Sequence, residues 1–222
     1  MKIDFHAHTH FSKDCLSDVR KVLQRAVEEG MGGIAITDHE TVEGALLARE
    51  IAGQDGMPLL VIVGEEIRTP HGEIMGLFLK RTIGACSVSR ALLEIRKQGG
   101  IASIPHPFDS MRGSALHPKW LSKKEVGQLH AIEVFNARAA LPSMNQSALE
   151  FAAGHNLAQL GGSDAHTLGE IGAAYTIVNA KDEKGVRDAI FKRKTKVEGA
   201  LSSPLVHLHS RYASLRKKML GD

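Results

Sequence analysis

Histidines and acidic residues occur in this chain as closely spaced pairs. His6 and His8 are separated by a single residue, and Asp164 and His166 repeat that spacing. In an extended segment, residues i and i+2 point to the same side, so each pair can place two donor atoms on one ion. Imidazole and carboxylate donors without a thiolate are typical of Zn, Fe, Mn or Co in catalytic sites, not of a structural zinc held by cysteines. The spacing therefore predicts metal chemistry.

Short apolar runs that alternate with longer amphipathic runs must position these pairs. Strands are expected at 2–5, 33–36, 59–63, 74–79, 101–104, 131–135, 157–160 and 174–178. Helices are expected at 17–29, 42–52, 87–98, 143–154, 183–192 and 205–220. This alternation indicates an α/β fold with a parallel sheet, either open or closed into a barrel.

Residues of metal-ligand type follow nearly every expected strand. In chain order they are His6 and His8, Asp38 and His39, Glu65 and Glu66, His106, Glu133 and Asn136, and Asp164 and His166. The carboxyl ends of parallel strands meet at one edge of a sheet, which is where α/β proteins bind their ligands. We therefore expect one site with more donors than a single ion can use, and hence two or three clustered metal ions.

Length and composition set the wider frame. The 222 residues suit one domain, expected at 1–200, followed by a basic helical tail at 201–222. A formal net charge of +3 is too small to indicate nucleic-acid or membrane binding by itself. Two cysteines give no disulfide framework, and the chain has no secretory signal or membrane-length apolar run, so a cytoplasmic protein is expected.

Six motifs taken together resemble a known family. They are His6-Ala7-His8-Thr9, Ile36-Thr37-Asp38-His39, Gly64-Glu65-Glu66, His106-Pro107, Glu133-Val134-Phe135-Asn136 and Gly162-Ser163-Asp164-Ala165-His166. In this order they resemble the motifs of the PHP (polymerase and histidinol phosphatase) superfamily, and above all its small stand-alone metal-dependent phosphoesterases. The resemblance implies a distorted seven-stranded β/α barrel, similar to a TIM barrel, with a trinuclear metal centre at the carboxyl ends of the strands.

The resemblance also implies how the ligands are shared among two to three divalent ions, Zn, Mn or Fe. The first ion would take His6, His8, Glu66 and Asp164. The second would share Glu66 and add His106 and Glu73, with His71 as the alternative to Glu73. The third would take Asp14, His39 and His166. Three divalent ions with four carboxylates leave a net positive cluster, which suits a phosphate anion.

The function that follows is hydrolysis of a phosphoester by a metal-activated hydroxide. Arg112, Arg138 and Arg68 are candidates to bind phosphate oxygens. His39 or Asp38 is expected to handle protons, with a supporting role as the alternative for Asp38; Glu133 and Asn136 are expected to support the ligands.

The sequence leaves the substrate open between a small phosphorylated metabolite, a nucleotide and a nucleic acid, and it does not give the oligomeric state. Two other functions are alternatives. An amidohydrolase-like C–N hydrolase would bring a metal-bridging lysine, which the motifs lack. A ribonuclease-associated nucleic-acid-binding subunit would be expected to have lost metal ligands, which this chain retains.

Overall fold

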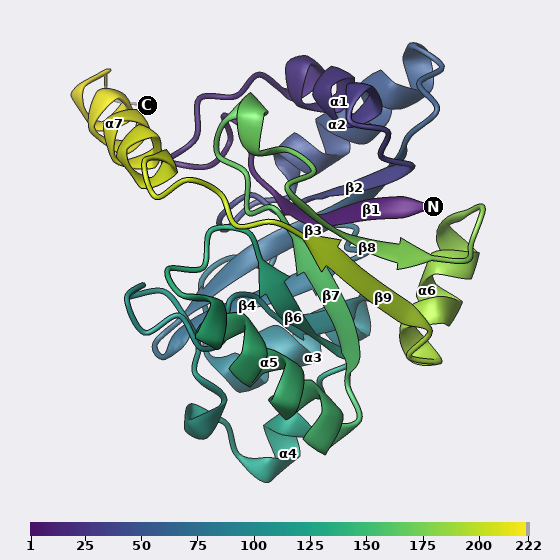
Figure 1. The fold of residues 1–222 in the computed structure, drawn as a ribbon, viewed down its shortest axis with the longest axis vertical. Coiled ribbons are helices and arrows are strands. Elements are labelled where there is room, and N and C mark those ends of the chain that lie inside the picture. The colour runs from purple at the N-terminus through teal and green to yellow at the C-terminus, as the bar shows by residue number, and fades with distance from the viewer. Residues whose placement is uncertain (221–222) are drawn as a thin grey trace.

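The computed structural model describes residues 1–220, in which strands and helices alternate along most of the chain (Figure 1). The strands are β1 (Lys2–Ala7), β2 (Gly33–Ile36), β3 (Leu60–Thr69), β4 (Gly72–Leu77), β5 (Ile101–Ile104), β6 (Ala131–Asn136), β7 (Ala158–Gly162), β8 (Ala174–Val178) and β9 (Thr195–Gly199). The helices are α1 (Val19–Glu28), α2 (Glu43–Gln54), α3 (Val88–Lys97), α4 (Lys123–Val126), α5 (Pro142–His155), α6 (Glu183–Phe191) and α7 (Val206–Leu220), with short 3-10 helices η1 (Pro118–Trp120) and η2 (Leu168–Glu170).

The strands form one 9-stranded sheet in the order β7-β6-β5-β4-β3-β2-β1-β8-β9. The expected α/β barrel-like fold is confirmed, but the sheet has nine strands where the resemblance implied seven, and it is mixed where the pattern indicated a parallel sheet. β4 runs antiparallel to β3 and β5, and β8 runs antiparallel to β1 and β9. A direct turn from β3 to β4 leaves no room for a crossover helix, so the two strands must form a hairpin.

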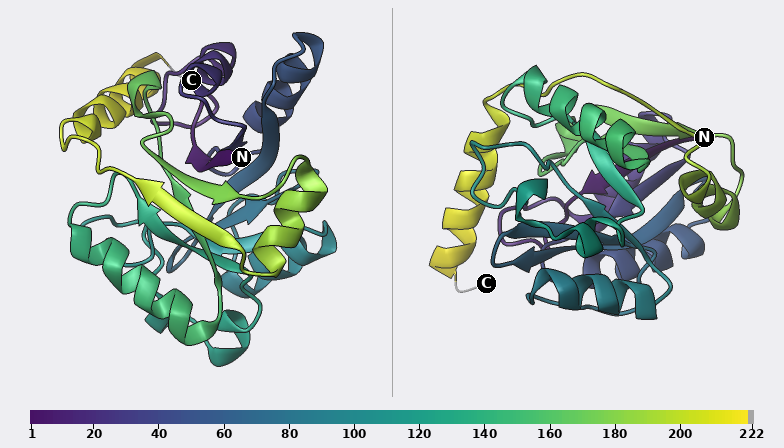
Figure 2. Two further views of the ribbon diagram at one scale, coloured as in Figure 1. Left: turned by 45° about the vertical axis from the view of Figure 1, so that its right-hand side comes forward. Right: turned by 90° about the horizontal axis from the view of Figure 1, so that it is seen from below.

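The sheet curls until β7 meets β1, which makes it nearly a closed barrel (Figure 2). Asp164 N donates to His6 O at 2.7 Å across this seam. Glycines make the approach possible: a Cβ at Gly161 would lie 2.4 Å from Val197, and one at Gly162 would lie 2.4 Å from Cβ of His6. The glycine pair thus lets the last ligand segment reach the first.

Two apolar clusters hold the barrel together. The inner cluster joins side chains from around the whole sheet, such as Phe5, Ile62 and Leu160, with Val186 and Ile190 of α6. Because α6 follows a strand antiparallel to β1, it covers the end of the barrel where β1 begins. The outer cluster joins the other strand faces to the helices around them. The opposite end of the barrel is therefore left for the polar residues.

An irregularity in β1 turns its histidines into this open end. Ile3 lies in the inner cluster while Ala7 lies in the outer cluster, so the alternation of side chains is broken between them. The pairing of β1 with β2 shifts register between Asp4 and Ala7, as a β-bulge does. Strict alternation would have placed His6 outside the barrel.

The C-terminal part of the chain is helical, as expected. α7 begins at Val206, and residues 221–222 of the expected 201–222 tail lie outside the described residues. Within residues 1–220, no helix combines the length and apolar character that a membrane-crossing segment requires.

Candidate metal centre

All the predicted metal ligands converge at the open end of the barrel. They are His6, His8, Asp14, His39, Glu66, Glu73, His106, Asp164 and His166, and all but Asp14 and His39 are buried. Glu73 reaches this end because β4 is antiparallel, which brings the start of β4 beside the end of β3. Glu73 groups with His39 and Glu66, whereas His71 is exposed and joins no such group among the described residues.

Two hydrogen bonds orient the rings of His6 and His8. Nδ1 of His6 lies 3.1 Å from Oε1 of Glu133, a carboxylate that can only accept. Nδ1 of His8 lies 3.0 Å from Oγ of Ser12. Ser12 already donates its hydroxyl proton to Asp38 at 2.7 Å, so it accepts from His8. Each neutral ring therefore carries its proton on Nδ1 and presents a bare Nε2.

The two Nε2 atoms meet two carboxylates. They lie 3.1 Å from each other, each is 3.4 Å from Oε2 of Glu66, and they are 3.6 Å (His6) and 3.4 Å (His8) from Oδ1 of Asp164. Four donors about 2.1 Å from a tetrahedral ion would be separated by about 3.4 Å. Four donors at this separation match a bound cation, which would replace the proton that a charged ring carries.

The second and third predicted ligand sets are also drawn together. Nε2 of His106 is 2.8 Å from Oε1 of Glu66 and 3.9 Å from Oε2 of Glu73. Asp14 places its two oxygens 3.5 Å from Nε2 of His39 and 3.4 Å from Nε2 of His166. Among the described residues, Oδ1 of Asp14 and Oε2 of Glu73 are buried without a hydrogen-bond partner. Such orphaned oxygens fit divalent cations and their ligand chemistry.

Two histidines carry raised pKa values because acidic groups surround them. Burial opposes protonation of His6, but the charges of Asp164, Glu133 and Glu66 outweigh it and hold the pKa of His6 well above its ordinary value. Burial likewise opposes protonation of His39, yet Glu66 and Asp14 raise its pKa to about 9. Without cations, protons on these rings neutralise the buried acids.

The pKa values of His8 and Glu73 are also shifted, that of His8 downward and that of Glu73 upward. Burial, together with the charge of His166, lowers the pKa of His8 to about 3. Burial and the nearby charge of Glu66 raise the pKa of Glu73 to about 8. A divalent ion would relieve the acid–acid repulsion and displace the protons.

Glu133 and Asn136 support the ligands through hydrogen bonds. Oε2 of Glu133 accepts from the backbone N of His106 at 2.7 Å and from Nδ2 of Asn136 at 2.9 Å. The same amide nitrogen donates to Oδ2 of Asp164 at 3.2 Å. Glu133 therefore connects both ends of the cluster, since its other oxygen contacts His6. His106 has φ 30°, a conformation that costs on the order of 1–3 kcal/mol and that these bonds hold in place.

Asp38 faces away from the donors. Its oxygens accept from the backbone N and the hydroxyl of Thr9 at 2.7 and 2.6 Å, and from Ser12 at 2.7 Å. This arrangement favours the alternative interpretation, in which Asp38 positions Ser12 and thereby His8, over direct proton transfer.

The three candidate arginines lie in different environments. Arg112 pairs with Asp164, and its buried Nη2 has no partner among the described residues, beside a cavity of about 250 Å³ that Asp14, His39 and His166 also line. Arg68 is exposed and pairs with Glu40 at 2.9 Å. Arg112 is thus the arginine best placed to meet an anion over the cluster.

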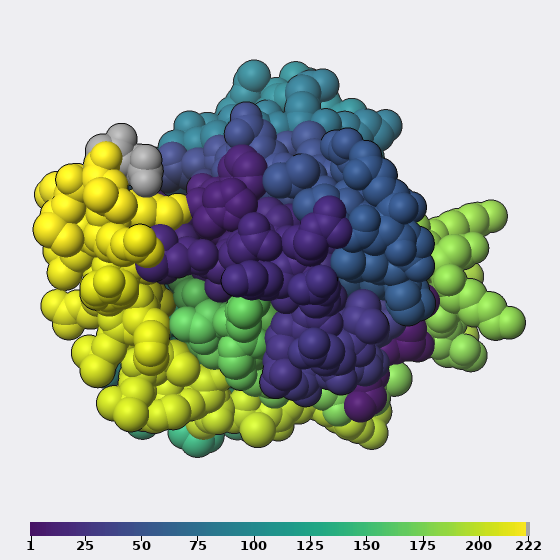
Figure 3. All heavy atoms as spheres, turned by 90° about the horizontal axis from the view of Figure 1, so that it is seen from above, coloured from purple at the N-terminus to yellow at the C-terminus, as the bar shows by residue number. Residues whose placement is uncertain are grey.

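Arg138 lines the same cavity and also contacts groups outside it. It is buried, lies 3.3 Å from Glu170, and donates to Oγ of Ser210 in α7 at 2.6 Å. At the other end of α7, Lys217 donates to the backbone O of Ser12 at 2.8 Å, and Figure 3 shows α7 beside the first residues of the chain. Arg138 therefore helps to hold α7 against the barrel, and both Arg138 and α7 line the cavity.

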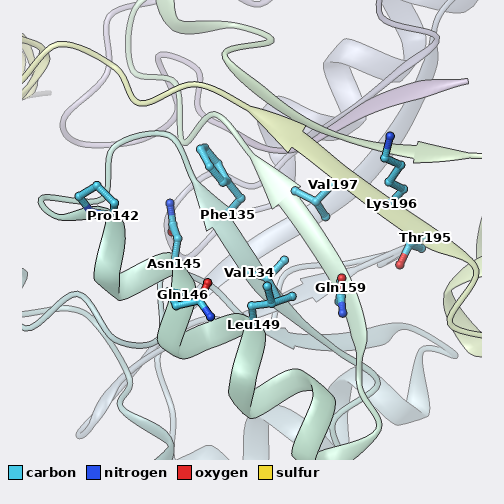
Figure 4. A pocket seen from close by; sticks show the side chains of 10 residues that line it. All are labelled: Val134, Phe135, Pro142, Asn145, Gln146, Leu149, Gln159, Thr195, Lys196 and Val197. Atoms are coloured by element: carbon cyan, nitrogen blue, oxygen red, sulfur yellow. The ribbon is translucent and has the colours of Figure 1, made fainter.

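Another pocket, of about 380 Å³, lies between α5 and strands β6, β7 and β9 (Figure 4). Its lining includes Val134, Leu149 and Val197 around the single charged side chain of Lys196. Its described lining offers no imidazole or carboxylate, which are the donors that the predicted metal centre uses.

Sequence reasoning missed Ser12, Thr9 and the α7 residues that border the cavity, His207, Ser210 and Arg211. No motif marks these α7 residues, because their place depends on how the end of the chain folds back. Ser12 and Thr9 lie just after His6 and His8 in the sequence, and this proximity was the only available indication that they support the histidine pair.

Comparison with known proteins gives a matching family model, related sequences and solved structures of similar fold. A family model described as PHP-associated matches residues 142–195. The uncharacterized protein MJ0417 of Methanocaldococcus jannaschii is 35% identical over 178 residues, which is 79% of this chain and 69% of the relative. The 5'-3' exoribonuclease Rnm of Escherichia coli is 42% identical over 66 residues, only 30% of this chain and 22% of the relative.

A solved structure shares the fold. It is a two-domain protein from Bacteroides vulgatus that contains a predicted PHP-like metal-dependent phosphoesterase. The TM-score is 0.74 at 23% sequence identity, covering 90% of this chain and 65% of that one. With the family model, the related sequences, the barrel and the motif residues gathered at its open end, the chain belongs to the PHP superfamily.

Proposed function

We propose that this protein is a metal-dependent hydrolase of phosphoester bonds. The observation that carries the proposal is the convergence of Nε2 of His6, Nε2 of His8, Oε2 of Glu66 and Oδ1 of Asp164 at separations that suit a tetrahedral ion. Two buried carboxylates that face two imidazoles need a balancing positive charge, and a divalent cation supplies it in place of ring protons.

The remaining donors support a cluster of ions. We assign the first ion to the four residues just named, the second to Glu66, Glu73 and His106, and the third to Asp14, His39 and His166. Divalent ions in such a cluster supply a strong nucleophile from water at neutral pH and offset the charge that develops on phosphate. Zn, Mn and Fe all accept these ligands.

The residues around the cluster supply orientation. Arg112 lines the cavity and has a buried Nη2 without a partner among the described residues, so its guanidinium is a candidate to donate to a phosphate oxygen. Glu133 and Ser12 hold the rings of His6 and His8 so that Nε2 remains the free donor. His39 lies at the edge of the cavity, 12% exposed, where it holds the third ion; when that ion is absent, its ring is the group best placed to pass a proton to a leaving oxygen.

The substrate is either a small phosphorylated compound or a nucleic acid. The similarity to the E. coli protein named 5'-3' exoribonuclease Rnm favours nucleic acid as the second candidate, although the match covers only 30% of this chain. The names of the Bacteroides and E. coli proteins favour hydrolysis of phosphoester bonds over the non-catalytic alternative, whereas a structural neighbour from Chromobacterium violaceum is named as an amidohydrolase.

The test is reconstitution. Metal-depleted protein is loaded with Mn²⁺, Zn²⁺ or Fe²⁺ and offered a phosphomonoester and a phosphodiester. We expect metal-dependent hydrolysis that is lost in His8→Ala and Asp164→Ala. His155→Ala and Asp188→Ala, both at exposed positions, serve as matched controls and should keep the activity. Equal hydrolysis by His8→Ala, Asp164→Ala and the unchanged protein would refute the proposal.

A further inference from the structure

An exposed tryptophan stands beside the metal centre. Trp120 is the only tryptophan in the chain, and 58% of it is exposed. Its indole lies parallel to the imidazole of His71, with 9° between the planes and 5.7 Å between the ring centroids. An indole is a large apolar group that proteins usually cover. Here two flat rings are instead presented together to solvent.

The two rings border a cavity that reaches the metal ligands. The cavity has a volume of about 420 Å³, and Trp120, His71, Glu73 and Ser114 are among its lining residues. Glu73 is one of the assigned ligands. Ser114 also lines the cavity over Asp14 and His39, so the two cavities adjoin each other at this residue. A molecule with its phosphate at the ions can therefore extend to the indole.

Positive charge accompanies the rings. Lys13 and Arg68 line the same cavity, and Nζ of Lys119 lies 5.4 Å from the centroid of the indole. Arg68 is paired with Glu40, whereas neither lysine forms an ion pair with another of the described residues. A flat aromatic surface beside lysines is the combination that proteins use to hold a base next to its phosphates.

Backbone contacts connect the segment that carries Trp120 to the strand that carries Glu73, one of the assigned metal ligands. Backbone N of Trp120 donates to His117 O at 3.0 Å within η1, and backbone N of Glu73 donates to Ser114 O at 2.8 Å. Gly72 has φ +127°, and a Cβ there would lie 2.4 Å from the backbone N of Leu116. Only glycine allows the segment before Trp120 to pack so closely on the β3–β4 hairpin.

We propose that Trp120 is a subsite for a nucleobase, so that the protein acts on nucleotides or single-stranded nucleic acid. This inference rests on the proposed function, because it places the phosphate of the same molecule at the metal centre. Stacking needs only a π-face, so the subsite accepts different bases. Trp120 binds and orients the substrate, and the step at phosphorus is left to the metal centre.

The test uses the intrinsic fluorescence of Trp120, which is the whole tryptophan signal of the chain. The metal-loaded protein is titrated with the non-hydrolysable methylene phosphonate analogue of adenosine 5′-monophosphate, and separately with methylphosphonate, which lacks the base. We expect the nucleotide analogue to quench the emission and methylphosphonate to leave it unchanged. Equal quenching by both compounds would overturn the inference.

Variants make the result specific. We expect Trp120→Ala to weaken binding of the nucleotide analogue on the order of 10-fold in calorimetry, and Trp120→Phe to restore most of it. Tyr212→Ala, at an aromatic residue that is 61% exposed in α7, is the matched control and should bind normally. Binding by Trp120→Ala within twofold of the unchanged protein would also overturn the inference.

Failure of this inference can be told from failure of the proposed function. Hydrolysis of glycerol phosphate, which has no base, is measured on the unchanged protein. Hydrolysis together with normal nucleotide binding by Trp120→Ala would reject the base subsite alone. Absence of metal-dependent hydrolysis of any phosphoester would reject the proposed function, and with it nucleotides and nucleic acid as the substrate class.

Discussion

Nε2 of His6 and Nε2 of His8 lie 3.1 Å apart, and neither carries the proton when its ring is neutral. The contacts of Nδ1 with Glu133 and Ser12 determine this arrangement. A bulge in β1 is what turns both rings to the same side as Glu66. The proposed metal centre depends on this one relationship, and the groups that maintain it can each be tested.

Glu133→Gln should weaken metal binding although Glu133 is not an assigned ligand. The amide lacks the charge that fixes the proton of His6 on Nδ1, and one of its ends donates where the backbone N of His106 also donates. We expect metal affinity to fall about 10- to 100-fold, as loss of a ligand's supporting group usually causes. Calorimetric titration with Mn²⁺ measures this. An unchanged affinity would show that the contact with His6 has no orienting role.

Gly44→Ala should destabilise the protein even though alanine favours helices. A Cβ at Gly44 would lie 2.1 Å from Oδ2 of Asp38 and 2.6 Å from Oγ1 of Thr9, so it would push apart the pair that supports Ser12. We expect a loss of about 1–3 kcal/mol in the free energy of unfolding, as overpacking of a core usually costs.

Gly53→Ala in the same helix is the matched control for that substitution. Nothing lies within 4 Å of a Cβ at Gly53, so we expect a gain of about 0.4–1 kcal/mol. Urea denaturation of both variants checks the opposite signs, and equal effects would contradict the packing around Asp38.

Metal binding should strengthen as pH rises. In the metal-free protein the pKa of His39 is about 9 and that of Glu73 is about 8, so both groups hold protons at neutral pH. An ion must displace these protons, and affinity should therefore increase up to about pH 9. Titrations in buffers of different ionisation enthalpy should detect proton release. Binding without proton release at pH 7 would be inconsistent with these pKa values.

The stability of the metal-free protein should change with pH in the opposite sense. The folded-state pKa of His39 lies above its usual value of 6.5, so its stabilising contribution is complete below about pH 6.5 and is lost as pH rises through about 9. Denaturation of chelator-treated protein at several pH values checks this. Stability that increases across this range would contradict the assigned shift.

Arg112→Ala should reduce kcat/KM for phosphoesters more than Arg112→Lys does. The guanidinium lines the cavity and pairs with Asp164, while its Nη2 has no partner among the described residues; a lysine retains the charge but not the two-point geometry. We expect losses of about 100-fold or more for alanine, comparable to removal of one preorganised donor. Steady-state kinetics on the metal-loaded variants provides the measurement. Equal kinetics for all three proteins would exclude Arg112 from phosphate binding.

The residues at the strand ends could be predicted from the sequence better than the direction and number of the strands in the sheet. Histidine and acid pairs next to apolar runs indicate which end of the barrel carries the site, because that depends on local pattern alone. The direction of β4 depends on a tight turn that the pattern does not specify, and it is what brings Glu73 into the cluster. β9 (Thr195–Gly199) was missed since its charged residues resemble a loop.

The supporting residues depend on distant contacts and were harder to predict. Arg138 was predicted to bind phosphate, but its contact with Ser210, which lies 72 residues away in the chain, had no signal in the sequence. Trp120 and His71 meet only because their loops pack together around Gly72. No local sequence pattern indicates that Trp120 and His71 stack on each other, so this part of the site could not be predicted from the sequence.

Anomalous diffraction from crystals grown with Mn²⁺ tests the central claim most directly. The proposed metal centre predicts a peak among Nε2 of His6, Nε2 of His8, Oε2 of Glu66 and Oδ1 of Asp164, with further peaks beside His106 and between His39 and His166. Crystals that bind Mn²⁺ elsewhere, or that show these four donors without a peak among them, would contradict it.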